Sequence, residues 1–191
     1  MILLEDTRNQ PGKHDMKNQY FSEHGIEVRR TKLYTGDYTL PTDQSVCIDT
    51  KKDIQELVGD ICGKSHERFR NELIRAQESG IKLYILVENY GGEIQQSGIF
   101  NKTVRSIDDL FDWKNPRLFI MRPDIKQIIG YRRSGTPIYK RVQKHPNATK
   151  GATLAKACIT MQEKYGVEFI FCSPEESGAK ILELLGVKVD G

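Results

Sequence analysis

Hydrophobic and polar positions along the chain repeat with two different periods. Short apolar runs predict buried strands, whereas apolar residues at i, i+3, i+4 and i+7 predict helices. Residues 54–61 show the helical period, and residues 82–88 are apolar on both strand faces, which predicts a central strand. The pattern predicts strands at 2–6, 26–34, 38–40, 45–51, 82–88, 117–121 and 167–172, and helices at 15–24, 54–61, 64 to about 80, 154–165 and 174–185.

Strands and helices alternate along the whole length, which is typical of an α/β fold with a sheet covered by helices. With 191 residues and 38% hydrophobic content, we expect one domain spanning 1–191. Residues 89–149 lack a clear period and contain a basic insertion at about 98–150. The stretch YRRSGTPIYKR (131–141) is predicted to be a hairpin within that insertion.

The sequence lacks the features of a membrane or secreted protein. It has no run of eighteen apolar residues, and its first ten residues, MILLEDTRNQ, are acidic where a secretory signal would be basic. We therefore expect a cytoplasmic protein with no membrane partner. Three of its four cysteines, Cys47, Cys158 and Cys172, lie in apolar runs and are expected to be reduced core residues.

Charge is distributed unevenly. Between Arg117 and Lys150, nine Lys or Arg residues accompany one acid, Asp124, so this segment carries about +8. The remaining 20 basic and 25 acidic residues give the rest of the chain about −5. A basic segment on an acidic protein favours nucleic-acid binding, although a solvated loop that only aids solubility is the alternative.

Strand-end carboxylates are the candidate chemistry. In the 45–51 strand, Asp49 and Lys51 share one face. Asp37 follows Gly36 in a predicted turn, and Asp6 ends the first strand, so all three carboxylates can meet at one end of the sheet. Such a gathering of like charges is unfavourable without a cation, which favours an Mg²⁺ or Mn²⁺ site. A salt bridge at the sheet rim is the alternative interpretation for Asp49 and Lys51.

These residues resemble the signature of the XPF family of structure-specific nucleases. LYTGDYTL (33–40) followed by VCIDTK (46–51) is similar to the family's Gly-Asp, spacer and Glu-Arg-Lys elements. EDTRN (5–9) resembles its first-strand Asp-x-Arg-Glu, and HERFRNEL (66–73) resembles its Gly-Arg-Phe-Arg helix. The resemblance covers residues 2–88, with weaker similarity at 151–172, and implies a restriction-endonuclease-like PD-(D/E)xK core with a central mixed sheet.

The chain departs from the family pattern at several positions. Asp49 stands where the family has Glu, Thr50 where it has Arg, and Asn9 where it has Glu. The later Asp of the family has no clean counterpart, and Asp53 and Glu56 are the candidates. The sequence after residue 185 is too short for the paired helix-hairpin-helix module that many members use to grip DNA.

The resemblance implies metal-dependent hydrolysis of phosphodiester bonds in branched or flapped DNA, as in junction resolution during recombination or repair. The implied catalytic residues are Asp6, Asp37, Asp49 and Lys51, with Mg²⁺ or Mn²⁺ held by Asp37 and Asp49, while Asp6 would bind a second metal or its water shell. Lys51 is expected to stay charged beside so many carboxylates and to orient water, not to act as a base. The expected DNA-binding residues are Arg8, Arg68, Arg70, Arg132, Arg133, Lys140 and Arg141, with Tyr131 and Tyr139 stacking.

The sequence also allows other interpretations. Arg68 could instead pair with Glu72 at i, i+4. The chain could be a non-catalytic scaffold subunit of a nuclease complex, or a restriction-like or RNA-directed nuclease. A homodimer or a partner protein would supply further DNA contacts. No phosphate-loop motif is present, so no nucleotide cofactor is expected.

Overall fold

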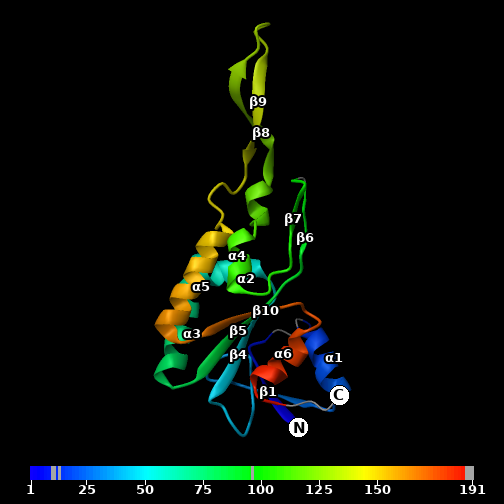
Figure 1. Ribbon diagram of the computed structural model, residues 1–191, viewed down its shortest axis with the longest axis vertical. Coiled ribbons are helices and arrows are strands. Elements are labelled where there is room, and N and C mark those ends of the chain that lie inside the picture. The colour runs from blue at the N-terminus through cyan, green and yellow to red at the C-terminus, as the bar shows by residue number, and fades with distance from the viewer. Residues whose placement is uncertain (10–11, 13, 96, 188–191) are drawn as a thin grey trace.

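The computed structural model describes residues 1–9, 12, 14–95 and 97–187, and a mixed six-stranded sheet lies at its centre (Figure 1). The strand order is β10-β5-β4-β3-β1-β2. Strands β4, β5 and β10 run parallel, β1 and β2 run parallel, and the short β3 is antiparallel to both β1 and β4. The strands are β1 (Ile2–Asp6), β2 (Glu27–Thr31), β3 (Tyr38–Thr39), β4 (Val46–Lys51), β5 (Lys82–Glu88) and β10 (Glu168–Cys172).

Helices cover both faces of the sheet. On one face α1 (Asp15–Glu23) and α6 (Ser177–Leu184) pack through Phe21 and Ile181. On the other face lie α2 (Ile54–Cys62), α3 (His66–Glu78) and α5 (Gly151–Tyr165). Alternate residues of β4 serve the two cores, because Ile48 packs toward α1 while Cys47 packs toward α2 and α3.

A tight turn brings Asp37 between β1 and β4. Gly36 has a φ of +71°, and a Cβ there would lie 3.0 Å from the carbonyl oxygen of Ile48, so the position suits only glycine. The Asp37 amide donates to Ile48 O at 2.7 Å, and Asp37 O accepts from the Asp6 amide at 2.8 Å. The loop before β3 therefore holds Asp37 beside the end of β4.

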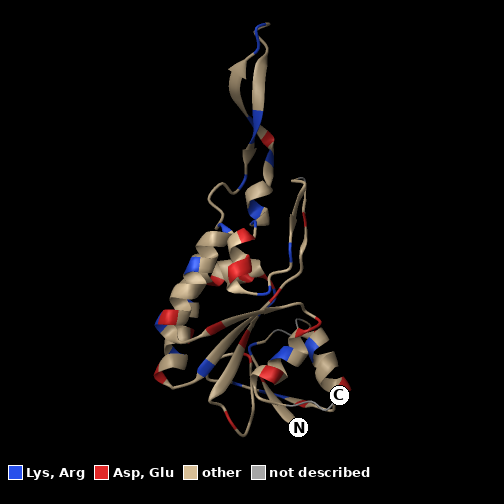
Figure 2. Ribbon diagram, in the orientation of Figure 1, with Lys and Arg blue, Asp and Glu red and all other residues tan. Residues whose placement is uncertain are grey.

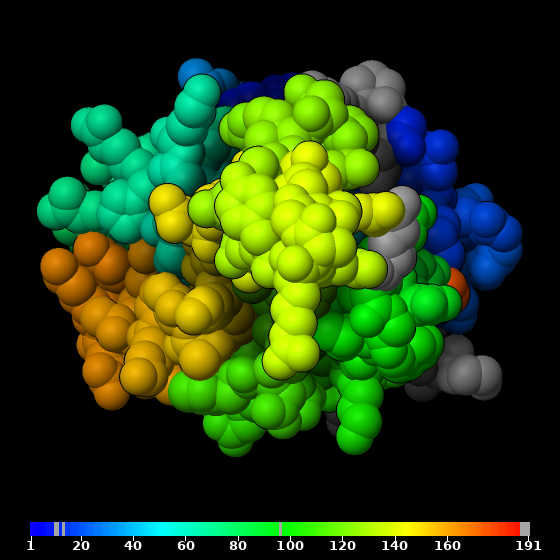
Figure 3. Space-filling view, turned by 90° about the horizontal axis from the view of Figure 1, so that it is seen from above, coloured from blue at the N-terminus to red at the C-terminus, as the bar shows by residue number. Residues whose placement is uncertain are grey.

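Residues 89–149 form a separate group of elements. After β5 come the hairpin of β6 (Gly92–Ile94) and β7 (Ile99–Asn101), helix α4 (Ile107–Asp112) and a 3₁₀ helix (Pro116–Phe119). Strands β8 (Met121–Tyr131) and β9 (Pro137–Gln143) then form a long hairpin, here called the arm (residues 121–143), which extends away from the sheet (Figure 1). Seen from above, the arm stands over the middle of the molecule (Figure 3). The Lys144 amide donates to Ile120 O at 2.7 Å and closes the base of the arm.

Most predicted elements are confirmed, and the exceptions lie near breaker residues. The strand predicted at 117–121 is wrong, because Asn115 accepts a hydrogen bond from the Arg117 amide at 3.0 Å and Pro116 begins a 3₁₀ turn. The last helix begins at Ser177, three residues later than predicted, because residues 173–176 form a turn. The hairpin predicted at 131–141 is confirmed as the tip of the arm.

Two further observations concern the cysteines and the helices. Cys47, Cys158 and Cys172 are buried free cysteines, whereas Cys62 is exposed. None of the helices in the described part of the chain has the length and apolar content needed to cross a membrane. The extent of a single nuclease domain, with its insertion at about 98–150, stays a prediction.

Candidate active site

A cavity of about 340 Å³ lies at the carboxyl end of β4. Its walls come from β4, the loop before β3, and helices α1, α2 and α3, so residues far apart in the sequence meet there. Charges of both signs line it: Arg8, Lys17, Lys51, Lys52, Arg68 and Arg75 are cationic, and Asp37, Asp49, Glu56 and Glu72 are anionic. The cavity is therefore a polar site at the edge of an apolar sheet.

Lys51 sits between two buried carboxylates. Its Nζ lies 2.7 Å from Asp49 Oδ2 and 2.9 Å from Asp60 Oδ2, and all three side chains are less than 10% exposed. The ammonium also lies 5.0 Å from the centre of the Phe69 ring. Burial alone would lower the pKa of Lys51, but the charges of Asp49 and Asp60 raise it above its ordinary value. Lys51 is therefore a fixed cation.

Asp37 is oriented by Thr50. Asp37 Oδ2 accepts hydrogen bonds from the Thr50 amide at 2.8 Å and from the Thr50 hydroxyl at 2.6 Å. Burial raises the pKa of Asp37, and the charge of Glu72 adds to this, while Thr50 and Lys51 act against it. The carboxylate is thus held in place next to β4.

Burial also raises the pKa of Asp49 well above its ordinary range. The charge of Lys51 opposes this rise, whereas the neighbouring charges of Asp37 and Glu72 increase it. The ionised forms of the buried Asp37 and Asp49 therefore repel each other, and a further cation nearby would favour both.

Glu72 is a cavity residue that the sequence interpretation assigned only as a partner of Arg68. In the structure Glu72 Oε1 accepts from the Gly36 amide at 3.0 Å and lies 3.3 Å from the Thr35 hydroxyl. The alternative in which Arg68 pairs with Glu72 is wrong. Arg68 Nη2 lies 3.8 Å from Asp60 Oδ1 instead. Glu72 borders the buried stripe of α3, a position that signals contact with the sheet.

Asp6 makes a different set of contacts from the one expected of a metal ligand. Arg8 donates to its carboxylate from the backbone amide at 2.6 Å, from Nε at 2.8 Å and from Nη2 at 2.7 Å. The Leu33 amide adds a fourth hydrogen bond at 2.9 Å. Burial would raise the pKa of Asp6, but these bonds together hold it below its ordinary value. Asp6 does not line the cavity, whereas the Arg8 that it holds does.

Asp53 and Glu56, the two candidates for the missing family carboxylate, lie in different places. Asp53 caps α2, where its Oδ1 accepts from the Glu56 amide at 2.7 Å. Glu56 lines the cavity and accepts from the Lys52 amide at 2.8 Å. Of the pair, Glu56 is the residue at the site.

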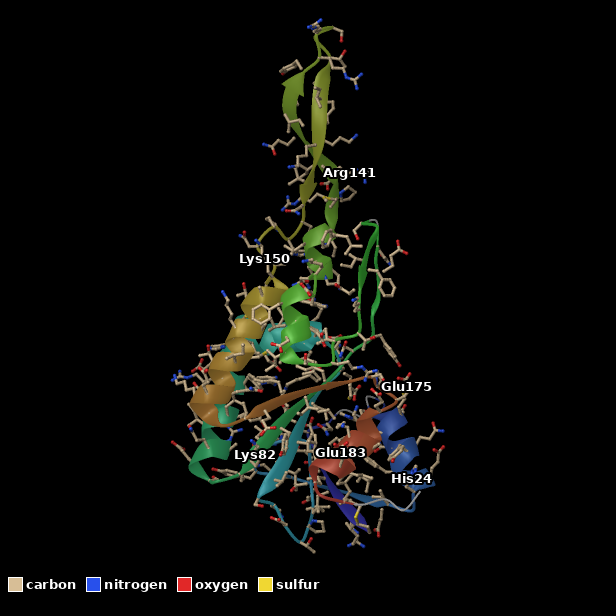
Figure 4. All side chains as sticks on the ribbon, viewed as in Figure 1. His24, Lys82, Arg141, Lys150, Glu175 and Glu183 are labelled. Carbon is tan, nitrogen blue, oxygen red and sulfur yellow. The ribbon has the colours of Figure 1, made fainter. Side chains whose placement is uncertain are left out.

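The expected DNA-binding residues lie in three places. Arg8 and Arg68 line the cavity, and the Arg68 side chain is 81% exposed. Arg70 is exposed and interacts with Tyr165 of α5, outside the cavity. The remaining four, Arg132, Arg133, Lys140 and Arg141, lie on the exposed arm, where Arg141 is labelled in Figure 4. Lys and Arg positions recur along the arm in Figure 2.

A family model described as an ERCC4 domain matches residues 6–185. The chain belongs to the ERCC4 domain family. This membership confirms the resemblance to XPF-family nucleases and supports a nuclease-type function in DNA processing for this ERCC4 domain.

Solved structures support the same fold. The ERCC4 domain is similar to XPF from Aeropyrum pernix, with a TM-score of 0.52, and to XPF from Aeropyrum pernix in complex with DNA, with a TM-score of 0.53. Both matches have 14% sequence identity and cover 97% of this chain and 63% of the other. The chain therefore spans less than two thirds of those structures, and at this identity the likeness concerns the fold. No curated protein matches the sequence.

The site of this ERCC4 domain fits Mg²⁺ or Mn²⁺ in donor type. Within the described residues, no group of three or more His, Cys, Asp or Glu is arranged to hold a metal ion. Mg²⁺, however, commonly uses one or two carboxylates and completes its shell with water and substrate phosphate. Asp37 and Asp49 are such a pair: burial raises the pKa of both carboxyls, and a divalent cation would favour their ionised forms. Asp6 does not fit, because both of its oxygens are engaged.

Two more buried charges near the site were missed by sequence reasoning. Asp60 supports Lys51, and Lys17 forms a buried ion pair with Glu88 at the end of β5. Lys17 also lines the cavity of the ERCC4 domain. Both residues look like ordinary polar positions of amphipathic helices, so their roles follow only from how the helices pack on the sheet.

Proposed function

We propose that this ERCC4 domain is a divalent-metal-dependent endonuclease that hydrolyses phosphodiester bonds in branched or flapped DNA. The observation that carries the proposal is the meeting of Asp37, Asp49 and Lys51 in one cavity, with Arg8 and Arg68 also lining it. Two carboxylates suit a divalent cation, and a fixed ammonium suits the negative charge that develops on a phosphate during hydrolysis. Arginines at the cavity suit the neighbouring phosphates of the same strand.

Asp37 and Asp49 would hold the Mg²⁺ or Mn²⁺, which would supply Lewis-acid chemistry at the scissile phosphate when bound. Thr50 prepares Asp37 for this role through two hydrogen bonds to one carboxylate oxygen. Glu72 supports the same loop from the other side by accepting from the Gly36 amide. The second-metal role expected of Asp6 is not retained, and we assign Asp6 to holding Arg8.

Lys51 would stabilise negative charge that develops on the phosphate and would orient the attacking water. Its pKa is raised by Asp49 and Asp60, so it stays protonated and is unsuited to act as a general base. Asp60 Oδ2 lies 2.9 Å from the ammonium and would hold it in place if Asp49 were to bind a metal. Asp60 is therefore a positioning residue for Lys51.

The arm would contact DNA at a distance from the cut. Its four expected residues, Arg132, Arg133, Lys140 and Arg141, suit phosphate contacts, and the exposed rings of Tyr131 and Tyr139 suit stacking on bases. Two separate contact regions, one at the cavity and one on the arm, suit a substrate whose helices diverge. A homodimer or a partner protein would add further contacts.

The test is cleavage of end-labelled linear duplex, flap, fork and four-way junction DNA in Mg²⁺, Mn²⁺ or EDTA. Asp49→Asn should abolish cleavage while DNA binding is kept, because a carboxylate ligand is lost and the fold is not. Asp43→Asn is the matched control, since Asp43 is an exposed carboxylate in the loop before the same strand. Equal cleavage by wild type and Asp49→Asn would refute the site.

A second candidate is a non-catalytic DNA-binding scaffold. The observation that favours it is that Lys51 already neutralises Asp49, and that no three-ligand metal group is found in the described residues. The two candidates differ in metal linkage, since a ligand at 100 times its Kd stabilises a fold by about 2.7 kcal/mol. Unfolding midpoints that are unchanged by Mn²⁺, together with tight DNA binding and no cleavage, would favour the scaffold.

A further inference from the structure

A second cavity is lined by the residues that follow β4, at the start of α2. It has a volume of about 380 Å³, within the range of small-ligand sites, and we call it the Gln55 pocket. Residues 51 and 52 line the catalytic cavity, whereas residues 53–55 line this pocket. Consecutive Cα atoms are about 3.8 Å apart, so the two cavities are close enough for one DNA strand to reach both.

The chemistry of the Gln55 pocket differs from that of the catalytic cavity. Ile54, Ile94 and Trp113 give it apolar walls, and Tyr90 stands at it with 59% of its surface exposed. In the described part of the chain, none of its lining residues is Lys or Arg, and two are acidic. The pocket therefore disfavours phosphate and suits a flat, uncharged group.

One hydrogen-bonding group in the wall, on Gln55, has no partner in the described part of the chain. Gln55 Nε2 donates to Asn115 Oδ1 at 2.9 Å, and Asn115 is fixed in turn by the Arg117 amide and by Thr149 O. This network sets the orientation of the Gln55 amide. Among the described residues no donor reaches Gln55 Oε1, although that oxygen is buried.

An unpaired acceptor in a closed wall is unfavourable unless a donor arrives. Gln55 lines the pocket, and because the terminal torsion of glutamine is soft, a donor bound in the pocket could be met by rotation of the amide. Asn89, by contrast, uses both ends of its amide on Val104 and serves only to build the wall. Gln55 Oε1 is therefore an acceptor that could bind an N–H donor of a ligand.

We propose that the Gln55 pocket holds one unpaired base of the DNA strand that lies in the catalytic cavity. The inference rests on the proposed nuclease function. A nucleobase is flat and uncharged, and its Watson–Crick edge carries the N–H donors that Gln55 Oε1 lacks. Branched and flapped DNA provides such bases already unpaired, so no base pair has to be opened. The pocket makes the protein sensitive to single-stranded DNA next to the cut.

The test uses Trp113, the one tryptophan of the sequence, as a reporter inside the pocket. The full chain is titrated in EDTA with a duplex that carries a five-nucleotide overhang, either with bases or with abasic sites throughout the overhang. We expect the overhang with bases to change Trp113 fluorescence and to bind about tenfold more tightly than the abasic form, as one stacked base does. This comparison needs no variant.

A variant then tests the hydrogen bond. Gln55→Leu should weaken binding of the base-containing overhang severalfold and leave the abasic form unchanged. Gln19→Leu is the matched control, because Gln19 is an exposed glutamine on α1 that contacts only Glu23 among the interactions described. Thermal unfolding of both variants shows whether the fold is kept.

Equal affinity and equal fluorescence change for the two overhangs would overturn the inference. The separate cleavage assay shows which proposal has failed. Metal-dependent cleavage without any base dependence would refute the pocket and leave the nuclease. Absence of both binding and cleavage on every DNA form would refute both.

Discussion

Replacing Lys51 by methionine tests the buried charge network most directly. The change keeps most of the side-chain volume and removes the ammonium that lies 2.7 Å from Asp49 and 2.9 Å from Asp60. Two carboxylates less than 10% exposed then lose their cation, and among the described residues Asp60 keeps one ion-pair partner, Arg68 at 3.8 Å. Removing one partner of a buried pair costs about 3–5 kcal/mol. We expect a loss of this size in the free energy of unfolding at pH 7.

The loss should shrink as the pH falls. Without Lys51 the pKa of Asp49, which burial already raises, rises further. The folded state then binds a proton more tightly than the unfolded state does. The free energy of unfolding of the variant therefore increases as the pH falls from 7 through the raised pKa, and its difference from wild type narrows.

The measurement is urea unfolding of wild type and Lys51→Met at pH 7 and pH 5, in EDTA so that no metal contributes. Lys82→Met is the matched control. Lys82 also lies on a strand, pairs with Glu168 at 2.5 Å and sits 5.4 Å from the ring centre of Tyr84, but its side chain is 37% exposed. Exposed pairs contribute about 0–1 kcal/mol. A loss in Lys51→Met no larger than in Lys82→Met, at both pH values, would refute the reasoning.

Two further predictions concern the arm and the core. The double change Arg132→Ala and Arg133→Ala should weaken DNA binding and lower the slope of log K against log salt by about 1–2, as two lost phosphate contacts would; an unchanged slope in a salt titration would return the basic segment to the solubility interpretation. Gly151→Ala should destabilise the fold by about 1–3 kcal/mol or more in urea unfolding, because its Cβ would lie 2.2 Å from Leu110 O. Gly59→Ala, also in a helix but with open space around it, should be neutral or stabilising by up to about 1 kcal/mol; similar behaviour of the two variants would contradict the packing argument.

Local periodicity was enough to predict most of the sheet and its helices. The apolar run of β5 and the stripe of α2 depend on burial on one or both faces, and such burial leaves a direct mark on the sequence. The prediction of a strand at 117–121 was wrong because local capping residues, and not burial, determine the structure there. Its apolar residues suggested a strand, but Pro116 and the side chain of Asn115 determine a 3₁₀ turn.

Strand geometry was enough to predict some residues of the candidate site but not others. Alternation along β4 was sufficient to place Asp49 and Lys51 on one face, and the structure pairs them at 2.7 Å. The second partner of Lys51 was not predictable, because Asp60 reaches it only through the packing of α2 on the sheet. Asp6 resembled a metal ligand because it lies at a strand end. In the structure, however, the guanidinium of Arg8 donates hydrogen bonds to both of its carboxylate oxygens.

The arm leaves and rejoins the body at neighbouring points, since the Lys144 amide donates to Ile120 O at 2.7 Å. Its strands pair with each other, and neither belongs to the central sheet. A short turn could therefore replace residues 121–143 without opening the hydrophobic core. The molecule is in this respect modular, because the arm can be lengthened, shortened or exchanged while the cavity at the end of β4 stays intact. Under the proposed function, the DNA contacts of the arm and the hydrolysis at the cavity would therefore be separately adjustable properties of one chain.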